Sequence, residues 1–126
     1  MLEIGIKGTG EAFVTESATA RAMGSGELPV YATPAMIALV EETAWKSVAD
    51  TLPPGQGTVG TKLDISHLAP TPVGKRVRCE TELRQIDRRR LVFHASVFDE
   101  TGLIAEGAHE RFVVDSEKFL AKAQGR

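Results

Sequence analysis

The sequence lacks several features that define large classes of protein. It contains one cysteine, Cys79, among 126 residues, so no internal disulfide can form, and we expect a reducing compartment such as the cytoplasm. No apolar run is long enough to cross a bilayer, and no N-terminal segment resembles a secretory signal. We therefore expect a chain that works without a membrane.

An excess of charge of one sign is also missing. The 15 basic and 17 acidic residues give a formal net charge of −2. This balance offers phosphates no broad positive field, so no nucleic-acid partner is predicted. Cys79, His94 and His109 do not have the spacing of a metal-ligand set, and no metal or other cofactor is predicted.

What the chain does contain is typical of one globular domain. Hydrophobic residues make up 42% of it and charged residues 25%, which is enough to build a core without disulfides or metal. No repeat or low-complexity tract interrupts the sequence, and its length fits one unit. We expect a single domain over residues 1–126.

Local patterns predict one long helix and several strands. Residues 33–52 form the helix, with Thr33 as the N-cap and Pro34 in the first helical position. Apolar and polar residues alternate over 59–69 and most cleanly over 76–84, which is the pattern of half-buried strands.

Polar turns connect the later strands into hairpins. Residues 87–90 lead into a strand over 91–98, and residues 99–102 lead into another over 103–114, so the sheet is antiparallel. The remaining predictions are an edge strand over 8–15, a flexible loop over 17–28 and a short helix from 115 or 116 to 123. The fold class is α+β, with the helix buried against the sheet.

Glu41 lies where an apolar residue is expected. At 100° per residue it falls on the helix face formed by Ile37, Ala38, Ala44, Trp45 and Val48. Its neighbour Glu42 falls on the other side, where it can pair with Lys46. A lone carboxylate on an apolar face costs several kcal/mol unless it is hydrogen-bonded, charge-paired or protonated.

His67 is the predicted partner of Glu41. It shares a strand face with Leu63 and Ile65, the face that should cover the helix. We expect Glu41 and His67 to meet in one pocket. A buried pair that only satisfies its own hydrogen bonds remains the alternative to chemistry at this point.

Several motifs resemble the fluoroacetyl-CoA thioesterase family. The resemblance spans nearly the whole chain and rests on the runs Tyr31-Ala32-Thr33-Pro34-Ala35-Met36 to Glu41, Gly57-Thr58-Val59-Gly60-Thr61, His67-Leu68-Ala69-Pro70-Thr71-Pro72 and Gly107-Ala108-His109-Glu110-Arg111. It implies a hot-dog fold, in which a curved antiparallel sheet wraps one long helix. It also implies a homodimer with acyl-CoA sites near the subunit interface, and the sequence is equally compatible with a tetramer.

The resemblance implies a site of five residues. Thr33, Glu41 and His67 match the catalytic threonine, glutamate and histidine, and Gly60 and Arg111 match positions that contact substrate. Three of these residues also have a purely structural interpretation. Thr33 could cap the helix, Gly60 could mark a bulge or a steric gap, and Arg111 could be a solvated surface charge.

The expected reaction is hydrolysis of a short or small acyl-CoA thioester to a carboxylate and coenzyme A. Glu41 either activates water or attacks the carbonyl to give a mixed anhydride, and His67 transfers a proton or orients the carboxylate. The family's fluoroacetyl-selective member has phenylalanines in a lid before the threonine, whereas residues 17–28 contain none. Selectivity for a fluorinated acyl group is therefore not expected.

Two other functions remain open from the sequence. A hot-dog enoyl-CoA hydratase would also use a buried acid and a histidine. A hot-dog dimer that binds acyl-CoA without turnover would keep the same pocket.

Overall fold

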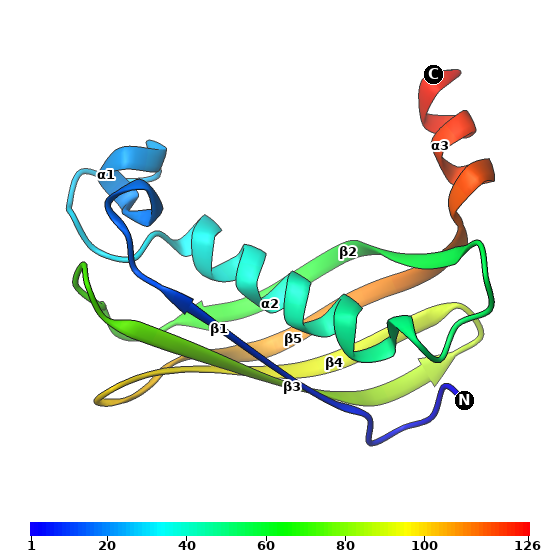
Figure 1. Ribbon diagram of the computed structural model, residues 1–126, viewed down its shortest axis with the longest axis horizontal. Coiled ribbons are helices and arrows are strands. Elements are labelled where there is room, and N and C mark those ends of the chain that lie inside the picture. The colour runs from blue at the N-terminus through cyan, green and yellow to red at the C-terminus, as the bar shows by residue number, and fades with distance from the viewer.

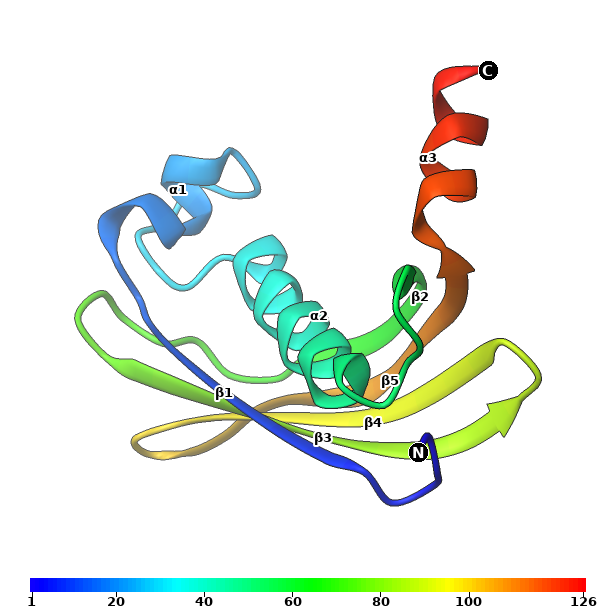
Figure 2. The same ribbon diagram turned by 45° about the vertical axis from the view of Figure 1, so that its right-hand side comes forward.

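A five-stranded antiparallel sheet and one long helix make up most of the computed structural model, which describes residues 1–126. The strands are β1 (Lys7–Phe13), β2 (Gln56–His67), β3 (Arg76–Asp87), β4 (Arg90–Asp99) and β5 (Gly102–Asp115), in the spatial order β1-β3-β4-β5-β2. The helix α2 (Thr33–Ala49) lies across the concave face of the curved sheet (Figures 1 and 2). The predicted α+β arrangement is confirmed.

The core lies between α2 and the sheet, on a helix face that differs from the predicted one. The buried residues of α2 are Met36, Leu39, Val40, Thr43, Ala44 and Val48. Ala38 and Trp45 were predicted to point inward and are exposed, Trp45 by 42%. The physical reason is that α2 packs mainly on β1 and β3, so that Glu41 faces Gly60 of β2 and Trp45 lies outside the main contact.

Strand β2 forms one edge of the sheet and is less buried than its alternation predicts. It pairs only with β5, and Leu63, which was predicted to cover the helix, remains 39% exposed. A register shift between Gly60 and Lys62 interrupts the pairing. Such bulges re-aim side chains and bend the strand. His67 is the last residue of β2.

The segments outside the sheet agree with the sequence only in part. The predicted loop over residues 17–28 is wrong in one respect, because it contains a short helix, α1 (Ala20–Met23), whose N-cap Thr19 accepts a bond from the Ala22 N–H. The predicted terminal helix is confirmed as α3 (Ser116–Gln124), which projects away from the sheet (Figure 1). None of the helices is both long enough and apolar enough to span a bilayer.

Candidate active site

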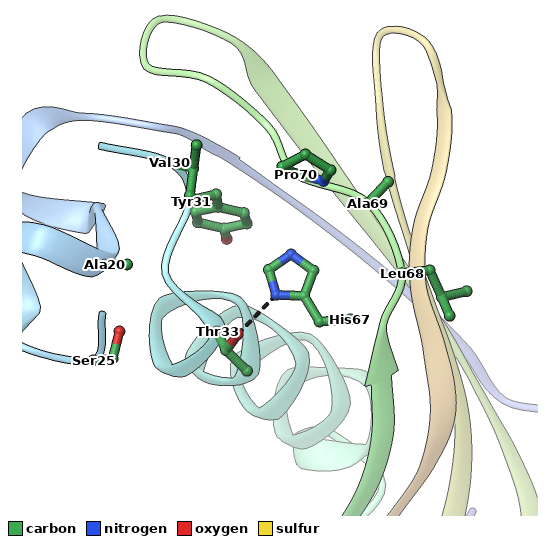
Figure 3. A pocket seen from close by; sticks show the side chains of 9 residues that line it. All are labelled: Ala20, Ser25, Val30, Tyr31, Thr33, His67, Leu68, Ala69 and Pro70. Carbon is green, nitrogen blue, oxygen red and sulfur yellow. Dashed lines mark hydrogen bonds between the residues drawn. The ribbon is translucent and has the colours of Figure 1, made fainter. Parts of the chain in front are cut away.

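Thr33 and His67 form a pair at the start of α2. The N-cap of this helix is Ala32, and no side chain caps it, so the predicted capping role of Thr33 is wrong. Thr33 is instead the first helical residue, and its Oγ1 lies 2.8 Å from Nδ1 of His67 (Figure 3). The hydroxyl is therefore available to the imidazole because the helix does not use it.

The environment of His67 favours the neutral imidazole. Partial burial lowers its pKa below the ordinary value of 6.5, and the backbone at Ala69 opposes this effect only in part. Its Nε2 is buried and has no hydrogen bond of ordinary geometry. A neutral imidazole carries one donor and one acceptor, so it can both give and take a proton.

A cavity of about 310 Å³ lies beside this pair (Figure 3). Its lining residues are Ala20, Ser25, Val30, Tyr31, Thr33, His67, Leu68, Ala69 and Pro70. No charged side chain is among them, and the volume is at the small end of the usual range for ligand pockets. The cavity suits a small neutral group.

Glu41 lies midway along α2 and contacts a different partner. Its Oε2 accepts a hydrogen bond of 3.2 Å from Nη1 of Arg111, in an ion pair where the arginine side chain is 6% exposed and the glutamate 39%. Within one chain no hydrogen bond or ion pair joins Glu41 to His67. The prediction that these two relieve each other's burial is therefore wrong for a single chain.

Gly60 leaves the space that Glu41 occupies. A Cβ atom at this position would overlap Oε2 of Glu41 and would lie 3.2 Å from Nη1 of Arg111. The backbone of Gly60 does not have a positive φ, so the requirement is steric and not conformational. Of the alternatives raised by the sequence, the structure supports both a steric gap beside the helix and an irregularity in β2 that begins at Gly60.

Arg111 is buried beneath α2 and is not a solvated surface charge. Its Nε donates to Oγ1 of Thr58 at 2.8 Å, and its Nη2 donates to the Thr58 carbonyl at 3.0 Å. Its Nη1 also lies 3.1 Å from Nε2 of His109, which is 0% exposed. Burial lowers the pKa of the guanidinium, and the Glu41 carboxylate opposes this shift.

Thr58 and His109 are neighbours of the site that were not predicted from the sequence. A signal for His109 was present, because strand alternation puts it on the same face of β5 as Arg111 and Val113, and that face is buried. No comparable signal marks Thr58, which contacts Arg111 only because β2 and β5 are paired.

The five predicted residues thus form two groups. The acid group contains Glu41, Gly60 and Arg111, and the imidazole group contains Thr33 and His67. The two groups start from positions eight residues apart on α2, which corresponds to about 12 Å of helical rise. Within one chain no hydrogen bond or ion pair connects them.

Comparisons with known proteins agree on one family. A family profile described as fluoroacetyl-CoA-specific thioesterase matches residues 14–117. The fluoroacetyl-CoA thioesterase of Streptantibioticus cattleyicolor is 40% identical over 95 residues, covering 75% of this chain and 68% of that protein. A solved structure of a fluoroacetyl-CoA thioesterase superposes with a TM-score of 0.93 at 34% identity, covering 100% of this chain and 98% of the other.

More distant structures show the same architecture. A Thermus thermophilus protein described as a thioesterase superfamily member has a TM-score of 0.90 at 27% identity, covering 98% of this chain and 92% of the other. A hot-dog-like protein from Thermanaerovibrio acidaminovorans has a TM-score of 0.89 at 22% identity, covering 99% of this chain and 93% of the other. The hot-dog fold implied by the sequence is therefore confirmed.

Proposed function

Since this chain belongs to the fluoroacetyl-CoA-specific thioesterase family, we propose that Glu41, His67 and Thr33 hydrolyse a small acyl-CoA thioester to a carboxylate and coenzyme A. Membership of the family makes the chain an acyl-CoA thioesterase. The choice of residues is our proposal, and the observation that carries it is the Glu41 carboxylate held by Arg111 at one oxygen only.

The free oxygen of Glu41 is the reactive one in this proposal. Oε2 accepts from Arg111, and Oε1 has no protein partner. In one route Oε1 takes a proton from water, whose oxygen adds to the thioester carbonyl before the C–S bond breaks and the thiolate takes up a proton. In the other, Oε1 itself adds to the carbonyl, expels the thiolate and forms an anhydride that water then hydrolyses.

Isotope labelling distinguishes these two routes. In a single turnover in H₂¹⁸O, labelled oxygen enters the Glu41 carboxylate only by the covalent route, when water attacks Cδ of Glu41 in the anhydride. Attack of water on the acyl carbon puts the label in the product carboxylate in both routes, and capture of an acyl-enzyme by mass spectrometry then identifies the covalent one. Gly60 is proposed to let the carboxylate reach the substrate, with its N–H as a donor to the thioester oxygen.

Thr33 and His67 are proposed to take part in proton transfer during the reaction. The neutral imidazole bonded to the Thr33 hydroxyl can take up the proton released when water attacks and then, as an imidazolium, pass it to the departing sulfur, or it can orient the substrate beside the cavity. The small uncharged cavity favours a short acyl group. Ser25 lines it and residues 17–28 contain no phenylalanine, so fluoroacetyl selectivity is not part of the proposal.

We also propose that the active unit is a homodimer in a reducing cytoplasm. Strand β2 is a 12-residue edge strand with unpaired backbone groups, which favour pairing with another strand. If β2 pairs antiparallel with its own copy about an axis between Leu63 and Asp64, Gly60 of one subunit lies opposite His67 of the partner subunit. The acid group of one single-domain protomer would then face the imidazole group of the other.

Mixing two inactive variants tests this arrangement. A heterodimer of Glu41→Gln and His67→Gln protomers regains one intact site only if each site draws on both subunits. With random exchange, the mixture would recover about a quarter of wild-type activity. Equal concentrations of unmixed variants are the control, and no recovery after verified subunit exchange would contradict the shared site.

A panel of acyl-CoA esters tests the reaction itself. We expect release of free thiol from short acyl-CoAs, measured with a thiol reagent, and lower kcat/KM as the chain grows beyond what the cavity holds. Crotonyl-CoA that is hydrated without thiol release would instead show a hydratase. Thermal stabilisation by acyl-CoAs with no turnover of any of them would show a binding protein.

A further inference from the structure

His109 is a buried histidine that the proposed reaction does not use. It lies on β5, is 0% exposed and pairs across the sheet with Leu63 of β2. Its ring is 6.4 Å from that of Phe93, centroid to centroid, so one side of the imidazole meets the apolar core. A polar ring in this place requires hydrogen-bond partners for both of its nitrogens.

The hydrogen-bond partners of the two ring nitrogens of His109 define a single protonation state of the ring. Nδ1 lies 2.9 Å from the backbone carbonyl of Lys62, which only accepts, so Nδ1 carries the proton. Nε2 lies 3.1 Å from Nη1 of Arg111, which only donates, so Nε2 is the acceptor. An imidazolium would direct an N–H at another N–H. The contacts are therefore satisfied only by the neutral Nδ1–H tautomer.

The charges around the ring favour the same state. Burial is the largest cause that lowers the pKa of His109, and the positive charge of Arg111 acts in the same direction. The Lys62 carbonyl and the carboxylates of Glu41 and Glu110 oppose the shift, and the net direction is downward. His109 is thus a stable acceptor for the guanidinium at neutral pH.

The acceptor determines how Arg111 meets Glu41. Nη1 has two protons, and its two partners are Nε2 of His109 and Oε2 of Glu41. Thr58 occupies the other side of the guanidinium through Nε and Nη2. With His109 in place, Nη1 has one proton left for the carboxylate, and Oε1 of Glu41 remains without a protein donor.

The bulge in β2 links the contacts of His109 to the rest of the acid group. The register shift lies between Gly60 and Lys62, so the carbonyl that fixes the His109 tautomer and the glycine that admits Glu41 flank the same irregularity. Thr61 between them donates from Oγ1 to the carboxylate of Glu110, at 2.7 Å, which ties the bulge to β5.

We propose that His109 is a positioning residue for thioester hydrolysis, whose Nε2 orients Arg111 so that the guanidinium holds one oxygen of Glu41 and leaves the other free to react. The proposal rests on the catalytic role proposed for Glu41. It assigns no contact with substrate to His109.

Two substitutions test the roles of the two ring nitrogens of His109 separately. In His109→Gln the amide oxygen reaches the position of Nε2 and can still accept from Arg111, whereas in His109→Asn the shorter amide keeps a donor toward Lys62 and loses that acceptor. We expect His109→Asn to lower kcat about 10–100-fold with KM changed less than about threefold, and His109→Gln to stay within about fivefold of wild type. His94→Asn, on the outer face of β4, is the matched control and should leave activity unchanged.

A spectroscopic measurement tests the proposal without turnover. The ¹⁵N shifts of His109 at pH 7 should show a protonated Nδ1 and an unprotonated, hydrogen-bonded Nε2, and the Arg111 Nη1 signal should move in His109→Asn but not in His109→Gln. An Nε2–H tautomer, or equal losses of kcat in both variants, would overturn the proposal. If the wild type hydrolyses no acyl-CoA, the proposed function fails and the ¹⁵N result still decides whether His109 orients Arg111.

Discussion

The acid group and the imidazole group are built in opposite ways. In the acid group, Arg111 is 6% exposed and makes four hydrogen bonds to Thr58, Glu41 and His109. In the imidazole group, one bond joins Thr33 to His67, Nε2 of the histidine has no partner, and the cavity opens directly beside them. One group is dense and charged, and the other is sparse and neutral.

The difference shows which part of the reaction each group suits. A buried cation needs fixed acceptors on several sides, and the same contacts hold Glu41 in one orientation. A proton carrier instead needs a nitrogen that is free to exchange partners as the reaction proceeds. The unpartnered Nε2 of His67 meets that need, whereas Nε2 of His109 is already engaged by Arg111.

Removing the charge of Glu41 should have the largest effect. Glu41→Gln keeps an oxygen that can accept from Arg111 but loses the base or nucleophile, and we expect kcat to fall about 10³-fold. Thiol release under saturating acyl-CoA measures this. Glu42→Gln is the control, because Glu42 makes only an exposed pair with Lys46 at 3.5 Å. Comparable losses in the two variants would argue against a special role for Glu41.

Filling the gap at Gly60 should have the next largest effect. In Gly60→Ala the new methyl overlaps Oε2 of Glu41, so the carboxylate must move away from Arg111. A displacement of this kind typically lowers kcat about 10²-fold. Gly57→Ala on the same strand is the matched control, since its Cβ would lie 3.4 Å from Oγ of Ser116, an ordinary contact. Wild-type kcat in Gly60→Ala would exclude the steric role.

Removing the hydroxyl of Thr33 should have a smaller effect and should separate function from capping. Thr33→Val loses a hydrogen bond worth about 1 kcal/mol, so we expect a five- to tenfold lower kcat, roughly, and Thr33→Ser should retain most of the activity. Because Thr33 does not cap α2, the free energy of unfolding should fall by no more than the value of the lost hydrogen bond, about 1 kcal/mol. A loss of about 2 kcal/mol by urea titration would instead show that Thr33 also caps α2.

The sequence predicted the elements better than it predicted the contacts between them. Alternation and turn residues gave the hairpins of β3, β4 and β5, and the helix period gave α2, because these depend on neighbours in the chain. The rotation of α2 depends on which strands it covers, so Trp45 was placed inward wrongly. The partner of Glu41 depends on where β5 lies across the sheet, which no local pattern in α2 encodes.

His67 and His109 illustrate the same limit. His67 was identified from its strand face and from the family resemblance, yet its partner proved to be Thr33 and not Glu41 within one chain. His109 lies on an equally clear strand face and was given no role. Its importance emerges only from the pairing of β5 with β2, which places it against Lys62 and Arg111.

The smallest of the predicted effects is the change of kcat/KM with pH near neutrality, and this change reports on the imidazole group. Since partial burial lowers the pKa of His67 and the neutral form is the active one, kcat/KM should rise with pH through a limb centred below 6.5 and be level by pH 7.5. The loss at pH 6.5 should therefore be less than about twofold. Tyr31 in the cavity wall does not contribute, because burial raises its pKa to about 12. In His67→Gln the residual activity should lack this limb, and a wild-type kcat/KM that falls as pH rises through this range would mean that the imidazole must be charged to act.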